Sequence, residues 1–489
     1  MIKNKKNKLK VILLIALILF TAAMAKAAVD EFMEDENMIE ISEYFKAGDE
    51  VVALDKLDKL IEADPQYENA LYLRAYWYIL TGKDSTQIME DIKAISQVQE
   101  DPAKIYEDMA YFCYDNNKFN LAKGLVEYAS PLYPYSYNLP VAKGLLEIEE
   151  DNIEKAIEYY KKALDIKPDY AYALIELTDA YMEQKEYEKA LATTDKMIQY
   201  NPDSHLAYHR RYNIYSDTER YEQALKAIQK AMKITENDAA NYAYYTALSA
   251  WSYMDLDDRA GMNNAAYKAK ALGDDFAYNM LDLDYDSTMV VKLESYPFSI
   301  GTLYAYHINA ENSEREFDFE FAVKVKEKSS EKLSYEWLIS RVYEKGEVSM
   351  DSTALQHADE LLDHFYGKDK EELTERTAVW VSKDVYNELE NGDEITLDTG
   401  KSKCKFKSVG IEPYRFVSNN VNVEMDVMRV QSARNKLKTE DGNKPEVLLI
   451  LADASNPLIM AMYLDWNIEL KKAFVNKNVS LKEVVQDME

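Results

Sequence analysis

The chain has 489 residues, of which 47% are apolar, so it is long enough for two or three packed domains. Its formal net charge of −30 repels the phosphates of nucleic acids and anionic lipid surfaces, which disfavours both as partners. The sequence contains two cysteines, Cys113 and Cys404, too few for a disulfide framework, and we expect two separate buried thiols.

The first 27 residues predict a targeting segment. A lysine-rich start is followed by an apolar run from Val11 to Phe20, and the small residues of A-M-A and A-K-A then fit a cleavage site. The apolar run is shorter than the roughly 20 residues that a membrane-spanning helix needs. We therefore expect residues 1–27 to be a cleaved secretory signal of a periplasmic or secreted protein. The alternative is a protein that stays membrane-anchored through an uncleaved N-terminal segment.

A period of 34 residues runs through the first half of the chain. Alanines and prolines recur at this step, at Ala122, Ala156, Ala190 and Ala224 and at Pro134, Pro168 and Pro202. A small residue lets the second helix of a unit approach the first, and larger residues such as Tyr160 and Ile228 fill the space beside it. Proline cannot continue the preceding helix. Each unit is thus a helix hairpin that buries its faces only by stacking on its neighbours.

This pattern resembles the tetratricopeptide repeat family. Leu174, Leu177 and Tyr181 stand where the family usually has a large residue, a leucine and a tyrosine. The register extends to weaker units at both ends, so we expect about seven hairpins over residues 34–272. The expected fold class is α + β: an all-α solenoid of tetratricopeptide-like hairpins, followed by a mainly antiparallel β domain with one or two helices.

The resemblance implies that ligands lie on a concave face formed by the first helix of each hairpin. At the corresponding positions stand Trp77, Tyr111, Tyr114, Tyr172, Asp179, His209, Asn213 and Trp251. This aromatic and mildly acidic set fits an apolar or aromatic segment of a protein or peptide partner, with room for a basic residue. It lacks the lysine and asparagine cluster that holds a terminal carboxylate in part of the family. The competing interpretation is that these rings pack against neighbouring helices.

Two groups of residues have the spacing of metal ligands. His205 and His209 share one helix face, but no H-E-x-x-H arrangement or cysteine accompanies them, so ordinary groove histidines are favoured. Asp282, Asp284 and Asp286 alternate like the first ligands of a calcium loop, without the glycine that such a loop needs. We therefore expect no metal and no other cofactor.

Residues 273–286 are acidic and predict a solvated linker, and residues 287–489 predict a β-rich binding domain, a sandwich or open barrel. The run from Phe317 to Lys326 alternates apolar and charged residues, as a half-buried antiparallel strand does. Similar runs predict further strands at 302–308, 333–343, 377–381, 394–397, 421–430, 447–451, 458–464 and 468–474. Helices are predicted at 354–366 and 383–390.

No nucleophile elbow, phosphate-binding glycine loop or paired-cysteine motif occurs in the sequence. Ser329 and Lys332 match S-x-x-K, yet they lie in a polar turn between two predicted strands. The segment from Asp453 to Pro457 predicts another turn. We therefore expect an exported, non-enzymatic protein that binds or scaffolds a partner. The alternative is a cell-envelope enzyme whose β domain acts on a substrate that the repeats recruit.

Overall fold

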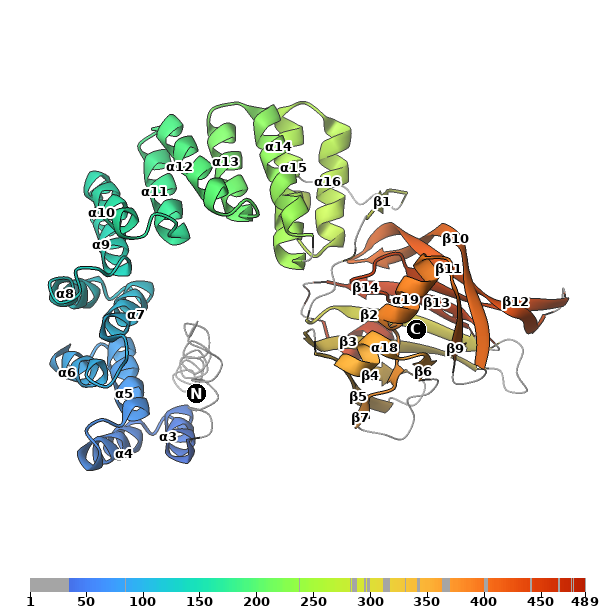
Figure 1. Ribbon diagram of the computed structural model, residues 1–489, viewed down its shortest axis with the longest axis horizontal. Coiled ribbons are helices and arrows are strands. Elements are labelled where there is room, and N and C mark those ends of the chain that lie inside the picture. Colours follow the sequence, from blue (N-terminus) through green and yellow to red (C-terminus); the bar gives the residue numbers. More distant parts are fainter. Residues whose placement is uncertain are drawn as a thin grey trace. The chain divides into compact units, whose positions relative to one another are not determined.

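The computed structural model describes residues 35–488 except positions 84, 237, 282, 284–287, 294–295, 297–299, 311–316, 330, 341–343, 363–369, 400–402, 440–441, 465–466, 476 and 478. The predicted signal segment 1–27 lies outside the described residues. The chain divides into two compact units, residues 1–202 and 203–489 (Figure 1). Among the residues described, no helix is both long and apolar enough to cross a membrane.

The first unit is a stack of helices in which each helix contacts the next one along the chain. These helices are α3 (Glu36–Ala47), α4 (Glu50–Ala63), α5 (Glu68–Thr81), α6 (Ser85–Ser96), α7 (Pro102–Asp115), α8 (Phe119–Ala129), α9 (Asn138–Glu149), α10 (Ile153–Ile166), α11 (Ala171–Glu183) and α12 (Tyr187–Tyr200). The helices pair as hairpins, and α10 and α12 end just before Pro168 and Pro202. Proline therefore separates successive hairpins at these two places.

Each hairpin turns at one residue with positive φ, and the second unit continues the pattern with α13 (His205–Asp217), α14 (Tyr221–Ile234), α15 (Ala239–Asp255) and α16 (Arg259–Ala271). The seven turn residues are Gly48, Gly82, Asn117, Asp151, Lys185, Glu219 and Asp257. From Asn117 to Glu219 they recur every 34 residues, which is the period of the alanines. The last interval is longer because α15 has 17 residues and α13 has 13.

The periodic alanines lie where the two helices of a hairpin meet. Ala122, Ala156, Ala190 and Ala224 are at most 1% exposed, and the large side chains of Tyr160 and Ile228 are fully buried, as the sequence predicts. Cys113 and Cys404 are also confirmed as buried thiols, each within its own unit. Burial raises the pKa of Cys113 to about 12.

In its described residues, the rest of the second unit is a sheet with four short helices, which confirms the expected change from helical repeats to a β-rich half. Its elements are α17 (Phe276–Met280), β1 (Val290–Lys292), β2 (Leu303–Ala310), β3 (Phe317–Lys328), β4 (Lys332–Ile339), β5 (Glu344–Asp351), α18 (Ser352–His357), β6 (Glu360–Leu361), β7 (Lys370–Leu373), β8 (Arg376–Thr377), α19 (Lys383–Glu390), β9 (Glu394–Asp398), β10 (Lys403–Ser418), β11 (Val421–Thr439), β12 (Gly442–Leu451), β13 (Ile459–Tyr463), β14 (Asn467–Phe474) and α20 (Leu481–Met488).

The sheet is mixed, and part of it closes on itself. Strands β10 to β14 pair antiparallel in chain order, and the end of β14 also pairs in parallel with the end of β10, at Val417↔Lys472. These five strands form a ring, which β2, β3, β4, β5 and β7 extend from one side and β9, β6 and β8 from the other. Other parallel pairs join β1 to β11, β5 to β7 and β6 to β8. Figure 1 shows α18 and α19 lying against the sheet.

The last repeat hairpin packs directly on this sheet. Tyr267, Leu272 and Tyr278 belong to the same buried cluster as Val291 and Phe416. The segment predicted as a solvated linker therefore contains α17, whose Ala277 and Tyr278 are buried. The aspartates at positions 282, 284 and 286, which are spaced like the first ligands of a calcium loop, lie outside the described residues.

Several elements differ from the sequence prediction. Strands β1, β5 and β7 have no counterpart among the predicted strands, and the strand expected over 377–381 is limited to Arg376–Thr377 and an isolated bridge at Trp380. The helix expected over 354–366 spans Ser352–His357, and its last predicted residues, 363–366, lie outside the described residues. The helix ends there because the chain is extended at Ala358, and Glu360 and Leu361 then pair with β8 and β9. The strand β10 is not predicted at all, although it runs for 16 residues and pairs with β9, β11 and β14.

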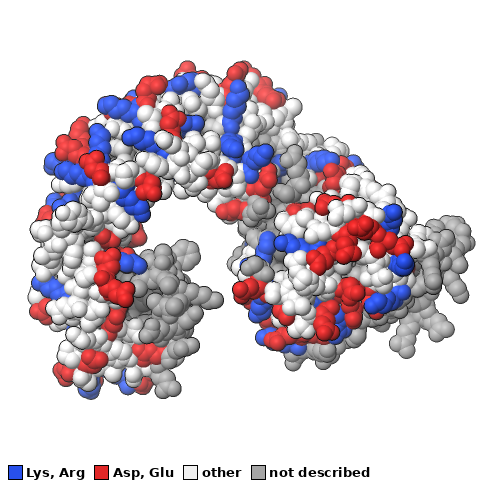
Figure 2. Space-filling model, viewed as in Figure 1, with Lys and Arg blue, Asp and Glu red and all other residues white. Residues whose placement is uncertain are grey.

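Acidic and basic side chains lie beside one another over the helices and over the sheet on the face that Figure 2 shows. Exposed ion pairs such as Lys123–Glu150 and Lys405–Glu394 are typical of this mixture. Such pairs contribute little to stability, on the order of 0–1 kcal/mol each, because water screens them. The surface charge therefore serves solubility more than folding.

Candidate functional site

Four tyrosine rings from three successive hairpins meet in the first unit. Tyr111 lies on α7, Tyr137 directly precedes α9, Tyr170 directly precedes α11, and Tyr172 lies on α11. The ring centroids are 6.1 Å apart for Tyr111–Tyr172, 6.4 Å for Tyr170–Tyr172 and 4.7 Å for Tyr137–Tyr170. We call these four residues the tyrosine patch. Tyr172 remains 37% exposed, so the patch has a face open to solvent.

Hydrogen bonds to the start of α9 hold the patch in place. The buried carboxylate of Glu107 accepts from Ser136 Oγ at 2.5 Å and from Asn138 Nδ2 at 2.6 Å. The Tyr111 hydroxyl donates to the carbonyl oxygen of Asn138 at 3.3 Å. These hydrogen bonds join α7 to the start of α9 and hold the ring of Tyr111, which limits the side-chain entropy that a ligand would have to remove there.

The surroundings of the patch are acidic and partly desolvated. Glu107 and Glu176 act on the hydroxyl of Tyr111, whose pKa burial raises. Asp108 lies on the same helix but acts on Tyr72 and Tyr76 of α5, and burial raises the pKa of Asp108 to about 6. Burial also raises the pKa of the Tyr170 hydroxyl to about 12. The amine of Lys167 sits 4.5 Å from the centroid of Tyr137. A cation already lies on one ring of the patch, which is the geometry of a cation–π contact.

The other predicted groove residues of the first unit lie in different surroundings. Tyr114 packs against Phe119 at 5.5 Å and donates its hydroxyl to Glu149 Oε1 at 2.7 Å. Trp77 stacks on Phe45 at 4.2 Å, and its indole nitrogen donates to Glu50 Oε1 at 2.9 Å. Asp179 is half-buried on α11. Trp77 therefore braces the first two hairpins and does not join the patch.

The predicted residues of the second unit form two further groups. His209 packs against Tyr244 at 5.6 Å and Tyr245 at 5.4 Å, while His205 Nδ1 lies 2.7 Å from the Tyr245 hydroxyl. Trp251 lies 6.3 Å from Phe276 of α17, and Phe276 is 56% exposed. Asn213 is half-buried on α13. Within the described residues, no group of three His, Cys, Asp or Glu side chains is placed to hold a metal ion.

Tyr137 and Tyr170 are the members of the patch that sequence reasoning missed. Both directly precede a first helix, whereas the prediction considered only positions inside these helices. A signal was present, because Tyr67 occupies the same place before α5. In this array, a tyrosine that directly precedes the first helix of a hairpin is therefore also a candidate groove residue.

The S-x-x-K match is a turn, as its sequence context predicts. Ser329 Oγ accepts from the backbone N–H groups of Glu331 and Lys332, at 3.3 and 3.0 Å. The Lys332 amine pairs with Glu327 at 3.0 Å and not with the serine hydroxyl. This arrangement lacks the base beside the hydroxyl that a serine nucleophile requires.

Comparisons with known proteins place the repeats in a family. Residues 147–211 and 207–238 match two models of the tetratricopeptide repeat. No curated protein matches the chain. Similar solved structures include MamA 41-end from Desulfovibrio magneticus RS-1, 18% identical, over 35% of this chain and 94% of that chain, with a TM-score of 0.31.

Two other similar structures have comparable values. YrrB, described as a TPR protein with an unusual peptide-binding site, is 18% identical over 39% of this chain and 97% of that chain, with a TM-score of 0.31. The pilF protein of Pseudomonas aeruginosa is 19% identical over 44% of this chain and 96% of that chain, with a TM-score of 0.29. The family assignment stands on the two models and on the repeated hairpins. Residues 147–238 belong to the tetratricopeptide repeat family.

Proposed function

We propose that this protein is an exported, non-enzymatic binding protein whose repeats hold a segment of a protein or peptide partner against the tyrosine patch. The observation that carries the proposal is the convergence of four rings from three hairpins, with Tyr172 37% exposed at their open side. Tyrosine offers a large contact area at a small entropic cost, so such clusters suit the recognition of peptides.

The chemistry of the patch indicates what the bound segment contains. The rings offer apolar faces to an aromatic or aliphatic side chain, and the carboxylate of Glu176, which acts on both Tyr111 and Tyr172, favours a nearby positive charge. The contact of Lys167 with the ring of Tyr137 shows that this aromatic surface accepts an ammonium group. We therefore expect a segment with an apolar or aromatic residue next to a lysine or arginine.

The test is recovery of the partner from the protein's own cell envelope by affinity capture. The variant is Tyr172→Ala, which removes the most exposed ring of the patch. The matched control is Tyr200→Ala, because Tyr200 is a similarly exposed tyrosine, 48%, at the end of α12 and outside the patch. We expect the wild type and the control to recover the same partner and Tyr172→Ala to lose it. Removing an aromatic side chain from a binding interface costs about 1–4 kcal/mol of binding free energy, depending on whether it lies at the rim or at the centre.

Equal recovery by all three proteins would refute the role of the patch, provided that their helical circular dichroism and thermal unfolding agree. A Tyr172→Phe variant separates the ring from the hydroxyl. It should recover the partner if the ring face carries the contact.

Export is tested independently, on the N-terminus of the protein purified from its native cells. The small residues at positions 23–27 give an expected start at Lys26 or Ala28. A retained Met1 would contradict cleavage and favour the anchored alternative.

A further inference from the structure

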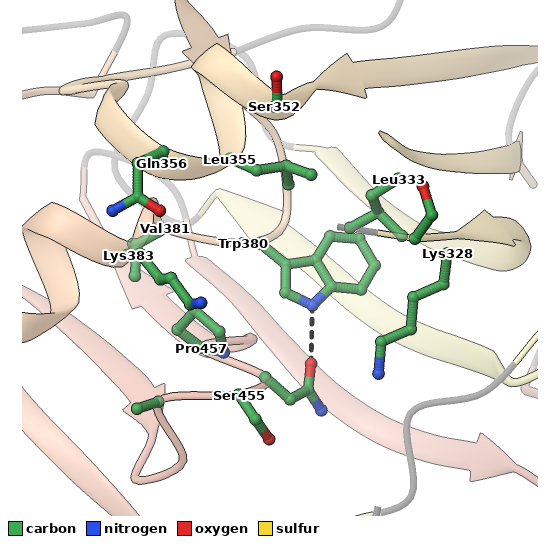
Figure 3. A pocket seen from close by; sticks show the side chains of 13 residues that line it. Lys328, Leu333, Ser352, Leu355, Gln356, Trp380, Val381, Lys383, Ser455 and Pro457 are labelled. Carbon is green, nitrogen blue, oxygen red and sulfur yellow. Dashed lines mark hydrogen bonds between the residues drawn. The ribbon is translucent and has the colours of Figure 1, made fainter. Parts of the chain in front are cut away.

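The β-rich half contains a cavity of about 200 Å³. Four separate segments line it: the end of β3 with the following turn and the start of β4, helix α18, the segment that leads into the start of α19, and the loop between β12 and β13. Its apolar side consists of Leu333, Leu355, Trp380 and Pro457. We call it the Trp380 cavity, after the indole at its centre in Figure 3.

Trp380 is held rigidly. Its side chain is 2% exposed, and its indole nitrogen donates to Asn456 Oδ1 at 2.9 Å. Its backbone forms a bridge with Leu458, and the flanking Val381 N–H donates to the Pro457 carbonyl at 3.1 Å. The loop that the sequence predicts as a turn at 453–457 therefore fixes the indole.

The residue before Trp380 has a strained backbone. Val379 has φ 69°, a conformation that a β-branched residue rarely adopts. The Ile459 N–H holds it there by donating to the Val379 carbonyl at 2.8 Å. Strain of this kind persists where the surrounding structure imposes it, and it clusters at ligand sites. In this protein the strained residue directs Trp380 to the cavity.

Two lysines, Lys328 and Lys383, line the cavity in a chain whose formal net charge is −30. Figure 3 shows Lys328 and Lys383 on opposite sides of the Trp380 indole. None of the described residues that line the cavity is acidic. The nearby carboxylate of Asp384 is engaged, since it accepts from Gln356 Nε2 at 2.8 Å and contacts His357 Nδ1 at 2.6 Å. Burial lowers the pKa of Lys328, and the negative charge of Asp453 counteracts this effect.

From this combination we infer that the Trp380 cavity is a binding site for a small carboxylate with a compact apolar group. The apolar group packs against Trp380, Leu333 and Leu355, and the carboxylate lies between Lys328 and Lys383. The volume admits a ligand about the size of an amino-acid side chain with its carboxylate. Both a free short-chain acid and the C-terminal residue of a peptide have this chemistry. The inference does not depend on the tyrosine patch.

The test is a titration of the full-length protein labelled with 5-fluorotryptophan, followed by fluorine NMR. Replacing each of the five tryptophans by phenylalanine in turn assigns the Trp380 signal. The probes are 4-methylpentanoate, benzoate and, as the neutral control, 4-methylpentanamide. We expect the carboxylates to shift the Trp380 signal and to saturate it with a Kd of about 0.01–1 mM. The amide should bind at least about tenfold more weakly, because it lacks the charge.

Lys328→Ala and Lys383→Ala should each weaken carboxylate binding about tenfold, and the double variant further. Lys407→Ala is the matched control, since Lys407 is an exposed lysine on β10 outside the cavity. A short peptide that ends in leucine, with a free or an amidated terminus, then distinguishes the two sources of ligand. An unmoved Trp380 signal at about 10 mM carboxylate, or equal binding of acid and amide, would overturn the inference.

Discussion

Gly144 lies against the ring of Tyr160, so closely that a Cβ atom at position 144 would be 2.3 Å from Tyr160 Cε1. This contact joins α9 to α10, and it is the tightest form of the small-against-large packing that the 34-residue period produces. Tyr160 is fully buried, so its ring has no free space into which it can retreat.

Gly144→Ala should therefore destabilise the first unit. Overpacking of this kind costs about 1–3 kcal/mol, which exceeds the helix-propensity gain of about 1 kcal/mol from replacing glycine by alanine. The measurement is urea unfolding followed by circular dichroism. Gly124→Ala on α8 is the matched control, because a Cβ there would meet nothing within 4 Å. The control should be more stable than the wild type, and a stabilised Gly144→Ala would contradict the packing argument.

The second prediction concerns the contact between the last repeat and the sheet. Asn419 Nδ2 donates to the carbonyl oxygens of Ala271, at 3.0 Å, and Val475, at 3.3 Å, and Asn419 Oδ1 accepts from the Val475 N–H. Ser418 Oγ also donates to the Ala271 carbonyl, at 2.6 Å, so Asn419→Ala removes one of two donors there and the side-chain partner of the Val475 N–H. The variant should lower the free energy of unfolding of the second unit by about 1–3 kcal/mol.

Asn420→Ala provides the control for that variant. Asn419 and Asn420 are the two central residues of the β10–β11 turn, with φ of 46° and 64°, so both substitutions incur the same left-handed backbone cost of about 1 kcal/mol. Asn420 is exposed, so only the Asn419 variant also loses buried hydrogen bonds. Equal destabilisation by the two variants would show that the hydrogen bonds to the last repeat contribute nothing.

The third prediction is that the β-rich half needs the last repeats in order to fold. Tyr267, Leu272 and Tyr278 are buried in the same cluster as the sheet residues, and each contributes about 1.5–3 kcal/mol by burial. A fragment of residues 203–489 should unfold in one cooperative transition. A fragment of residues 288–489 should lose that transition and the near-ultraviolet signal of its packed aromatic rings. An unchanged urea midpoint in the shorter fragment would contradict this.

The sequence predicts the elements whose local pattern matches their surroundings. Helix α19 has the predicted bounds, because an apolar stripe with Val385 and Leu389 faces the sheet. Strand β10 was missed because Gly410 and Pro413 interrupt its alternation. In the structure it tolerates both, since the register shifts near Gly410 and Pro413 still pairs with Asp426. Prediction from strand propensity therefore failed at a place where a β-bulge lets the strand accommodate a glycine and a proline.

In the two candidate sites, too, the sequence predicts some of the residues and misses others. The repeat register predicted Tyr111 and Tyr172, since both stand at fixed positions of first helices. It missed Tyr137 and Tyr170, whose rings reach the patch from the turns. The Trp380 cavity was not predictable, because its lining comes from four segments between residues 328 and 457 that only the sheet brings together. A sequence period predicts how neighbouring hairpins stack, but it does not predict contacts between segments that lie far apart in the sequence.

The last prediction concerns the pH dependence of the first unit. Burial raises the pKa of Asp108 from 3.8 to about 6, so the folded state binds this proton more tightly than the unfolded state does. The contribution of Asp108 to stability is therefore present below pH 3.8 and is lost as the pH rises to about 6. Asp108→Asn removes this loss. The variant should exceed the wild type in free energy of unfolding by about 1–3 kcal/mol at pH 7.5, and by less at pH 4. Urea unfolding of both proteins at these two pH values measures the difference, and an equal difference at both would show that Asp108 is not titrating in this range.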